Sequence, residues 1–118
     1  YKLSTATADG GVAASIRVDV AQADYYKTRF THPASFSSSP ALNDAVAWTG
    51  STVVGQVSVA GMSAYEAAKV TYNNVTEFNM TLAGSTWFTV ASTASYGSTK
   101  SLPAGNYTAI IKAECIAK

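Results

Sequence analysis

The sequence is poor in charge, histidine and cysteine, and each shortage argues against a class of function. Charged residues make up 13% of the chain, against about a quarter in an average globular protein. The net charge is +1 and Lys and Arg form no run, whereas nucleic-acid binding needs clustered basic residues. One His, one Cys and scattered carboxylates make no catalytic pair, triad or ligand cluster. We therefore expect no enzyme, no metal, no cofactor and no nucleic-acid partner.

Long apolar stretches are also missing. No window approaches the roughly 18 apolar residues of a membrane-spanning helix, and Tyr1 leads straight into polar sequence instead of the apolar centre of a signal peptide. We expect a mature or trimmed form. A chain of 118 residues predicts a single domain with one core. His32, which precedes Pro33 in a Ser- and Pro-rich loop, is expected to be a surface imidazole.

The chain is instead rich in hydroxyl groups and in apolar residues that alternate with polar ones, as in β-strands. Ser and Thr occur fourteen times each. Alternating apolar residues predict strands over residues 12–20, 25–30, 52–60, 69–75, 76–82, 87–90 and 107–115, with one short helical turn at 62–69. Residues 83–85 read as a hairpin turn, and Gly55 marks a weak point in its strand. About seven short strands predict an all-β, immunoglobulin-like antiparallel sandwich.

The same alternation predicts which side chains form the core. We expect burial between two sheets for seven residues: Ile16, Val18, Val57, Val59, Phe78, Leu82 and Ile111. Trp87 and Phe88 are neighbours on one strand, so one ring should enter the core and the other should cover a sheet face. Trp48, Tyr25 and Tyr26 lie near predicted loops. They are candidates for binding a ligand such as a sugar, with structural packing as the alternative.

The last predicted strand combines large and small side chains on one face. Tyr107, Ala109, Ile111, Ala113 and Cys115 point one way, and the residues between them point the other way. Cys115 has no second cysteine to pair with, and its place in the alternation predicts a buried, inert thiol. The small side chains at 109 and 113 leave hollows between larger neighbours. Gly105 lets the chain turn into this strand without a side chain.

The terminal segment "LPAGNYTAIIKAECIAK" resembles the last strand of subunits of chaperone–usher fimbriae, especially the Dr/Afa-type adhesins and the capsular fibre antigens. Those families have a glycine fourteen residues from the C-terminus that opens a strand of alternating apolar residues, and Gly105 is the fourteenth residue counting back from Lys118. The "GNYT" run and the closing Ala117-Lys118 are similar to the Dr/Afa ending. Upstream, "VAASIRVDVAQ" and "VVGQVSVAG" are similar to the first half of such subunits.

The resemblance implies an immunoglobulin-like fold that lacks its final strand and is completed by a donated one. Residues 1–11 would then be a donor segment and hinge, and residues 12–118 the pilin domain. The implied donor face is Tyr1, Leu3, Thr5 and Thr7. The implied acceptor strand carries Gly105, Tyr107, Ala109, Ile111, Ala113 and Cys115.

The implied partners are neighbouring fimbrial subunits, a periplasmic chaperone, an outer-membrane usher and a host receptor or glycan. The implied location is an extracellular fimbrium on the bacterial cell surface. Two other functions remain open from the residues alone. One is a self-contained carbohydrate-binding sandwich that uses Trp48 and tyrosines, and the other is an immunoglobulin-like decoration domain of a phage or cell-surface protein. Strand exchange predicts that the chain forms polymers and that changes at the terminus block their formation. A lectin-like domain would instead bind sugar as a monomer.

Overall fold

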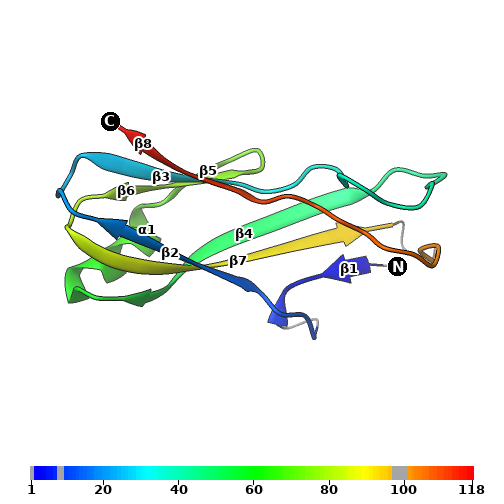
Figure 1. Cartoon of the computed structure of the whole chain (residues 1–118), viewed down its shortest axis with the longest axis horizontal. Helices are drawn as coiled ribbons and strands as arrows, with labels where there is room; N and C mark the ends of the chain where they lie inside the picture. Colours follow the sequence, from blue (N-terminus) through cyan, green and yellow to red (C-terminus); the bar gives the residue numbers. More distant parts are fainter. Residues whose placement is uncertain (1, 8–9, 97–100) are drawn as a thin grey trace.

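Alternating apolar residues form two antiparallel sheets that pack against each other (Figure 1). The structure is a computed structural model, and it describes residues 2–7, 10–96 and 101–118. The elements in chain order are β1 (Lys2–Ser4), β2 (Ala14–Val20), β3 (Tyr26–Thr31), β4 (Ala47–Val57), the 3₁₀ helix η2 (Ala60–Ala64), α1 (Tyr65–Ala68), β5 (Val70–Tyr72), β6 (Val75–Met80), β7 (Gly84–Ser95) and β8 (Lys112–Ala117). The predicted all-β sandwich and the short helical turn are both confirmed.

The first sheet is organised around β7. Strand β4 pairs with β7 along one edge, and β1 and β2 share the other edge end to end. The second sheet has the order β5-β6-β3-β8. Strands β2 and β8 therefore each end a sheet, and each has one hydrogen-bonded neighbour among the described residues.

Three phenylalanines from both sheets form the centre of the core. Phe30 on β3, Phe78 on β6 and Phe88 on β7 are 0–1% exposed, and their ring centroids lie 4.6–6.0 Å apart. The rings meet at tilted or edge-to-face angles, which aromatic pairs favour. Phe88 is thus the core ring that the sequence predicts. Its neighbour Trp87 lies on the opposite face of β7, with the Arg17 guanidinium 5.2 Å from its ring centroid.

The predicted core list is right in part. Val18 and Phe78 are buried, and Ile16, Val57, Leu82 and Ile111 are partly buried against the core. Val59 was predicted to be buried but is 40% exposed, because β4 ends at Val57.

A register shift between Val54 and Gln56 changes which side chains of β4 face the core. Val54 lies opposite buried Phe88. Unbroken alternation would place Val53 on the face of Val57, but Val53 is 39% exposed. Gly55 lies at this irregularity, as expected of an isolated glycine in a strand.

The turn at residues 83–85 crosses the sandwich, so the predicted hairpin is wrong. Strand β6 pairs with β3 and β5, whereas β7 belongs to the other sheet. Gly84 has φ +138°, and a Cβ there would lie 2.8 Å from Met62 Cε. The positive φ is the reason that this crossing favours glycine, because residues with a Cβ rarely adopt it.

His32 is buried, which corrects the expectation of a surface imidazole; it is 3% exposed. Its Nδ1 lies 3.0 Å from the carbonyl oxygen of Asn74, and its Nε2 lies 2.7 Å from Thr52 Oγ1. A carbonyl only accepts, so Nδ1 donates to Asn74, and Nε2 of the neutral ring accepts from the Thr52 hydroxyl. The imidazole thereby ties the end of β3 to β4 and to the β5–β6 turn.

Lowering the pH from about 8 to about 5 is expected to destabilise the fold through His32. Burial lowers the pKa of His32 below its ordinary value of 6.5, against the opposing effect of the Asn74 hydrogen bond. The unfolded chain therefore binds a proton near pH 6.5 that the folded chain excludes, and stability falls as the pH drops through this value. Urea midpoints measured across the range should decrease, and His32→Gln should flatten the trend. Equal wild-type midpoints at both ends would contradict this role.

Candidate functional site

The inner face of β8 is open to solvent although it belongs to the core side of its sheet. Ala113 lies directly opposite Phe30 on β3, and Cys115 lies opposite Thr28. Directly opposed residues project to the same face of a sheet. Phe30 and Thr28 are 0% and 1% exposed, yet Ala113 and Cys115 are both exposed. No element of the described chain covers this part of the core face of β8.

The exposure of Cys115 corrects the prediction of a buried, inert thiol. The alternation correctly assigned this side chain to the core-facing side of its strand, opposite Thr28. Burial also needs a neighbour on that side, and the sequence pattern does not report whether one is present. The exposed thiol is therefore a sign of an incomplete core beside β8.

Strand β2 forms the facing wall of the open region. Ile16 and Val18 of β2 line a cavity of about 280 Å³ together with Thr28, Ala113 and Cys115. The cavity thus lies between the free edge of one sheet and the free edge of the other. We call the channel between these edges, together with the continuation described next, the β2–β8 groove.

The groove continues beside the segment that precedes β8. A second cavity, of about 550 Å³, lies along residues 105–111 and is bounded on the far side by β1. Its main apolar lining is Leu3, Phe36, Trp48, Tyr107 and Ile111. Residues 105–111 are extended and make one isolated bridge, between Thr108 and Ser38. Tyr107, Ala109 and Ile111 therefore lie along one groove with Ala113 and Cys115, as the alternation indicates.

The open edge runs nearly the whole length of the molecule. At about 3.3 Å per residue, residues 105–117 span roughly 40 Å, and the longest molecular dimension is 47 Å. Figure 1 shows this segment, coloured orange to red, crossing the sandwich from one end to the other. The groove is long enough to hold one complete extended strand.

Two residues that line the groove carry a buried hydroxyl group without a hydrogen-bond partner among the described residues. Thr28 Oγ1 belongs to a residue that lines the smaller cavity, and Ser92 Oγ to one that lines the larger. Buried polar atoms in native proteins are almost always hydrogen-bonded, and an unpaired one needs an explanation. Sequence reasoning missed both residues, because their hydroxyls are ordinary in a chain so rich in Ser and Thr.

Side chains cover part of the far edge of the first sheet. Glu66 on α1 accepts a hydrogen bond from the backbone N–H of Val54, with Oε1 at 2.8 Å, and Lys69 Nζ donates to the carbonyl of Thr52 at 3.1 Å. Burial alone would raise the pKa of Glu66, but hydrogen bonds from Lys69 and Val54 lower it overall. Helix α1 therefore satisfies backbone groups at the edge of β4, in contrast to the open β8 edge.

The predicted donor segment lies against its own sheet. Leu3 in β1 pairs with Ala94 of β7. Thr5 exchanges hydrogen bonds with Ser92, its N–H to the Ser92 carbonyl and its Oγ1 from the Ser92 N–H, each at 2.9 Å. Thr7 is exposed. Tyr1 and Asp9 of the expected donor and hinge lie outside the described residues.

Gly105 begins the groove-lining segment with backbone geometry that a side chain would disturb. Its φ is +148°, and a Cβ there would lie 2.6 Å from Pro40 Cγ. The glycine allows the chain to pass close to the loop that holds Pro40 and to enter the extended segment. The structure therefore places Gly105 where the chain turns into the predicted acceptor strand.

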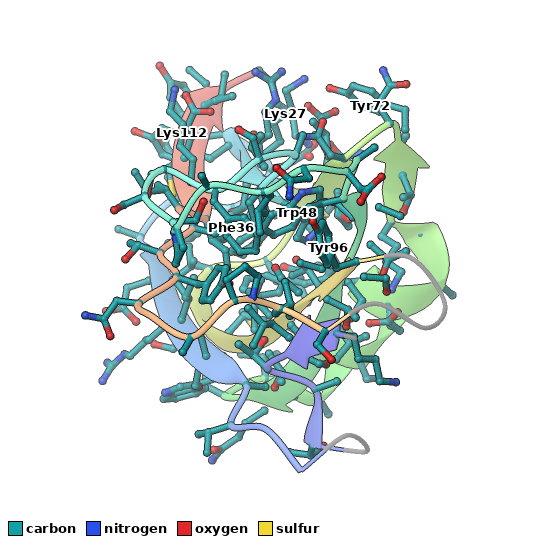
Figure 2. The ribbon with its side chains drawn as sticks, turned by 90° about the vertical axis from the view of Figure 1, so that its right-hand side faces the viewer. Lys27, Phe36, Trp48, Tyr72, Tyr96 and Lys112 are labelled. Atoms are coloured by element: carbon teal, nitrogen blue, oxygen red, sulfur yellow. The ribbon has the colours of Figure 1, made fainter. Side chains whose placement is uncertain are left out.

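The three candidate ligand-binding aromatics do not form one site. Trp48 is partly buried beside the larger cavity, where its ring centroid lies 4.7 Å from that of Phe36; Figure 2 shows these two side chains next to each other. The ring centroids of Tyr25 and Tyr26 lie 4.6 Å apart. Both residues are next to the end of β8, where Tyr26 pairs with Ala117. Ligand binding by these residues stays a prediction.

The described residues contain neither a cluster of metal ligands nor a membrane-spanning helix. Within residues 2–7, 10–96 and 101–118, no three His, Cys, Asp or Glu side chains come together in a group that could hold a metal ion. Over the same residues, no helix is both long and apolar enough to span a membrane. Comparison of the chain with protein-family models, curated proteins and solved structures finds no match. Within the described residues, the β2–β8 groove is the structural feature that bears most directly on function.

Proposed function

We propose that the chain is a structural or adhesive subunit of an extracellular bacterial fimbrium that is assembled by donor-strand exchange. The observation that carries the proposal is the exposure of Ala113 and Cys115 opposite buried Phe30 and Thr28. A sandwich that was complete within one chain would cover these side chains. An added strand would cover them by pairing with the free edge of β8.

Strand addition meets the physical needs of the groove. Backbone groups on the open edge of β8 and on residues 105–111 supply hydrogen bonds to an extended segment, and alternate side chains of that segment enter the cavities. The occupant that we propose is an extended segment of a neighbouring subunit. Before assembly the open edge is an aggregation hazard, which gives a reason for a periplasmic chaperone and an outer-membrane usher as partners.

The two cavities set what the donated strand must carry. Apolar residues line most of the larger cavity, including Leu3, Phe36, Trp48 and Ile111, so the strand should bring at least one large apolar side chain there. The smaller cavity, with Thr28, Ala113 and Cys115, has less room. The unpaired hydroxyl of Thr28 further suits a small polar donor residue. Our candidate donor is residues 1–10 of a second copy, whose Tyr1, Leu3, Thr5 and Thr7 share one face of an extended strand.

A synthetic peptide of residues 1–10 is expected to raise the thermal unfolding midpoint of the full chain. A ligand that binds only the folded state stabilises it by about 2.7 kcal/mol at a hundredfold excess over its Kd, and the midpoint rises with ligand concentration. The control peptide carries Leu3→Asp, which places a charge in the apolar cavity and should give no shift. Absence of a shift with the native peptide would retire this donor. Slow exchange, in the chain alone, of the β8 amides that point away from β3 would retire strand addition itself.

A further inference from the structure

The smaller cavity of the β2–β8 groove holds a thiol whose chemistry strand addition does not use. Cys115 is the one cysteine in the sequence, and it is exposed on the groove face of β8. Thr28 lies directly opposite it on β3 and lines the same cavity. An incoming small molecule can therefore reach the sulfur from the side that the core would normally close.

The hydroxyl of Thr28 is a second unpaired group beside this cavity. Thr28 is 1% exposed, and its Oγ1 has no hydrogen-bond partner among the described residues. A buried hydroxyl without a partner costs free energy that a polar ligand in the cavity would recover. Thr28 and Cys115 thus both line one cavity of about 280 Å³. The rest of its lining is Ile16, Arg17, Val18 and Asp19 of β2, with Ala113 and Glu114 of β8.

We propose that Cys115 is a thiol-modification site that takes a low-molecular-weight disulfide, and that the resulting adduct blocks strand addition. The second half of this proposal rests on the proposed function, whereas the first half concerns the isolated chain. The reaction is thiol–disulfide exchange. The Cys115 thiol loses its proton to solvent, and the thiolate attacks one sulfur of the small disulfide. A new bond to Sγ forms as the old S–S bond breaks, and the leaving thiolate takes up a proton.

The position of the sulfur explains why modification and strand addition exclude each other. Cys115 lies between Ala113 and Ala117 on the inner face of β8, so a strand along this edge must pass over it. A group attached to Sγ would occupy the space that the donor side chain needs. By the same geometry a docked strand covers the thiol, and each event lowers the affinity for the other by an equal factor. A free thiol reverses the modification and reopens the groove.

The first experiment measures adduct formation on the full chain, with glutathione disulfide as the probe and intact mass as the readout. We expect one adduct on the folded wild type and none on Cys115→Ser. The rate on the folded chain should be within about tenfold of the rate in urea, because access does not limit the reaction. A folded-state rate more than about a thousandfold slower than the unfolded rate would mean that the thiol reacts only through opening of the structure, and this would overturn the site.

The second experiment adds the peptide of residues 1–10 to the purified adduct. The thermal shift that the unmodified chain shows should disappear in the adduct and return after reduction with dithiothreitol. Equal shifts for both forms would overturn the blocking role and leave the proposed function intact. If the adduct forms but the peptide shifts the midpoint of neither form, both the blocking role of the adduct and residues 1–10 as the donor would be overturned. The modification site would then be supported by the rate of adduct formation alone.

Discussion

Replacing Phe88 with Ala is expected to lower the free energy of unfolding by about 3–5 kcal/mol, the largest effect of any substitution considered for this chain. Phe88 is fully buried on β7, and its ring lies 4.9 Å from Phe30 and 4.6 Å from Phe78, measured between centroids. Both contacts join β7 of the first sheet to strands of the second. The truncation therefore removes apolar burial and leaves a cavity at the point where the two sheets meet.

The control for this prediction is Tyr25→Ala, which removes an aromatic ring that is 47% exposed at the end of the sandwich. Its cost should stay below about 1 kcal/mol, because surface substitutions rarely exceed that. Urea denaturation of the two variants beside the wild type gives both values. A Phe88→Ala midpoint as close to the wild type as that of Tyr25→Ala would mean that the two sheets do not share this core.

Replacing Ala113 with Arg is expected to weaken binding of the donor strand while leaving the stability of the fold almost unchanged. Ala113 is exposed in the chain alone, so the free energy of unfolding should change by less than about 0.5 kcal/mol. A donated strand would bury the new charge without a partner, which is strongly unfavourable. We expect the affinity for the peptide of residues 1–10 to fall at least about a hundredfold, equivalent to about 2.8 kcal/mol.

Ala67→Arg is the matched control, because it makes the same substitution at an exposed position on α1, the helix beside the edge of β4 and away from the groove. This variant should bind the peptide as the wild type does. Kd values from thermal-shift titrations of the three chains decide the matter. Equal peptide affinity in Ala113→Arg and the wild type would show that the peptide does not lie along the inner face of β8.

The strand content and the face assignment of the terminal segment could be predicted because both follow from local alternation. Phe30 and Phe78 alternate with polar neighbours on strands that the structure contains, and Ala113 and Cys115 share a face as expected. Alternation reports which side of a strand faces the core. It does not report whether the opposite sheet covers that side, which is why Cys115 was expected to be buried.

The remaining differences come from long-range contacts that a local pattern does not contain. His32 is buried because Thr52 and Asn74 each supply a partner for one ring nitrogen, and these residues lie 20 and 42 positions away. The register shift between Val54 and Gln56 exchanges the faces of β4. In the same way, the pairing of Leu3 with Ala94 depends on the far end of β7.

Amide hydrogen exchange along residues 105–117 is the most direct test of the central claim, that the chain folds as a sandwich with one strand missing beside β8. Strand β7 is paired on both sides and serves as the internal reference. In the chain alone, we predict fast exchange over residues 105–111, except at Thr108, whose N–H donates to the carbonyl of Ser38. The β8 amides that point away from β3 should also exchange fast, and β7 should exchange slowly. A bound donor strand should slow these amides to the level of β7. Exchange in residues 105–117 that is already as slow as in β7 in the chain alone would contradict the account.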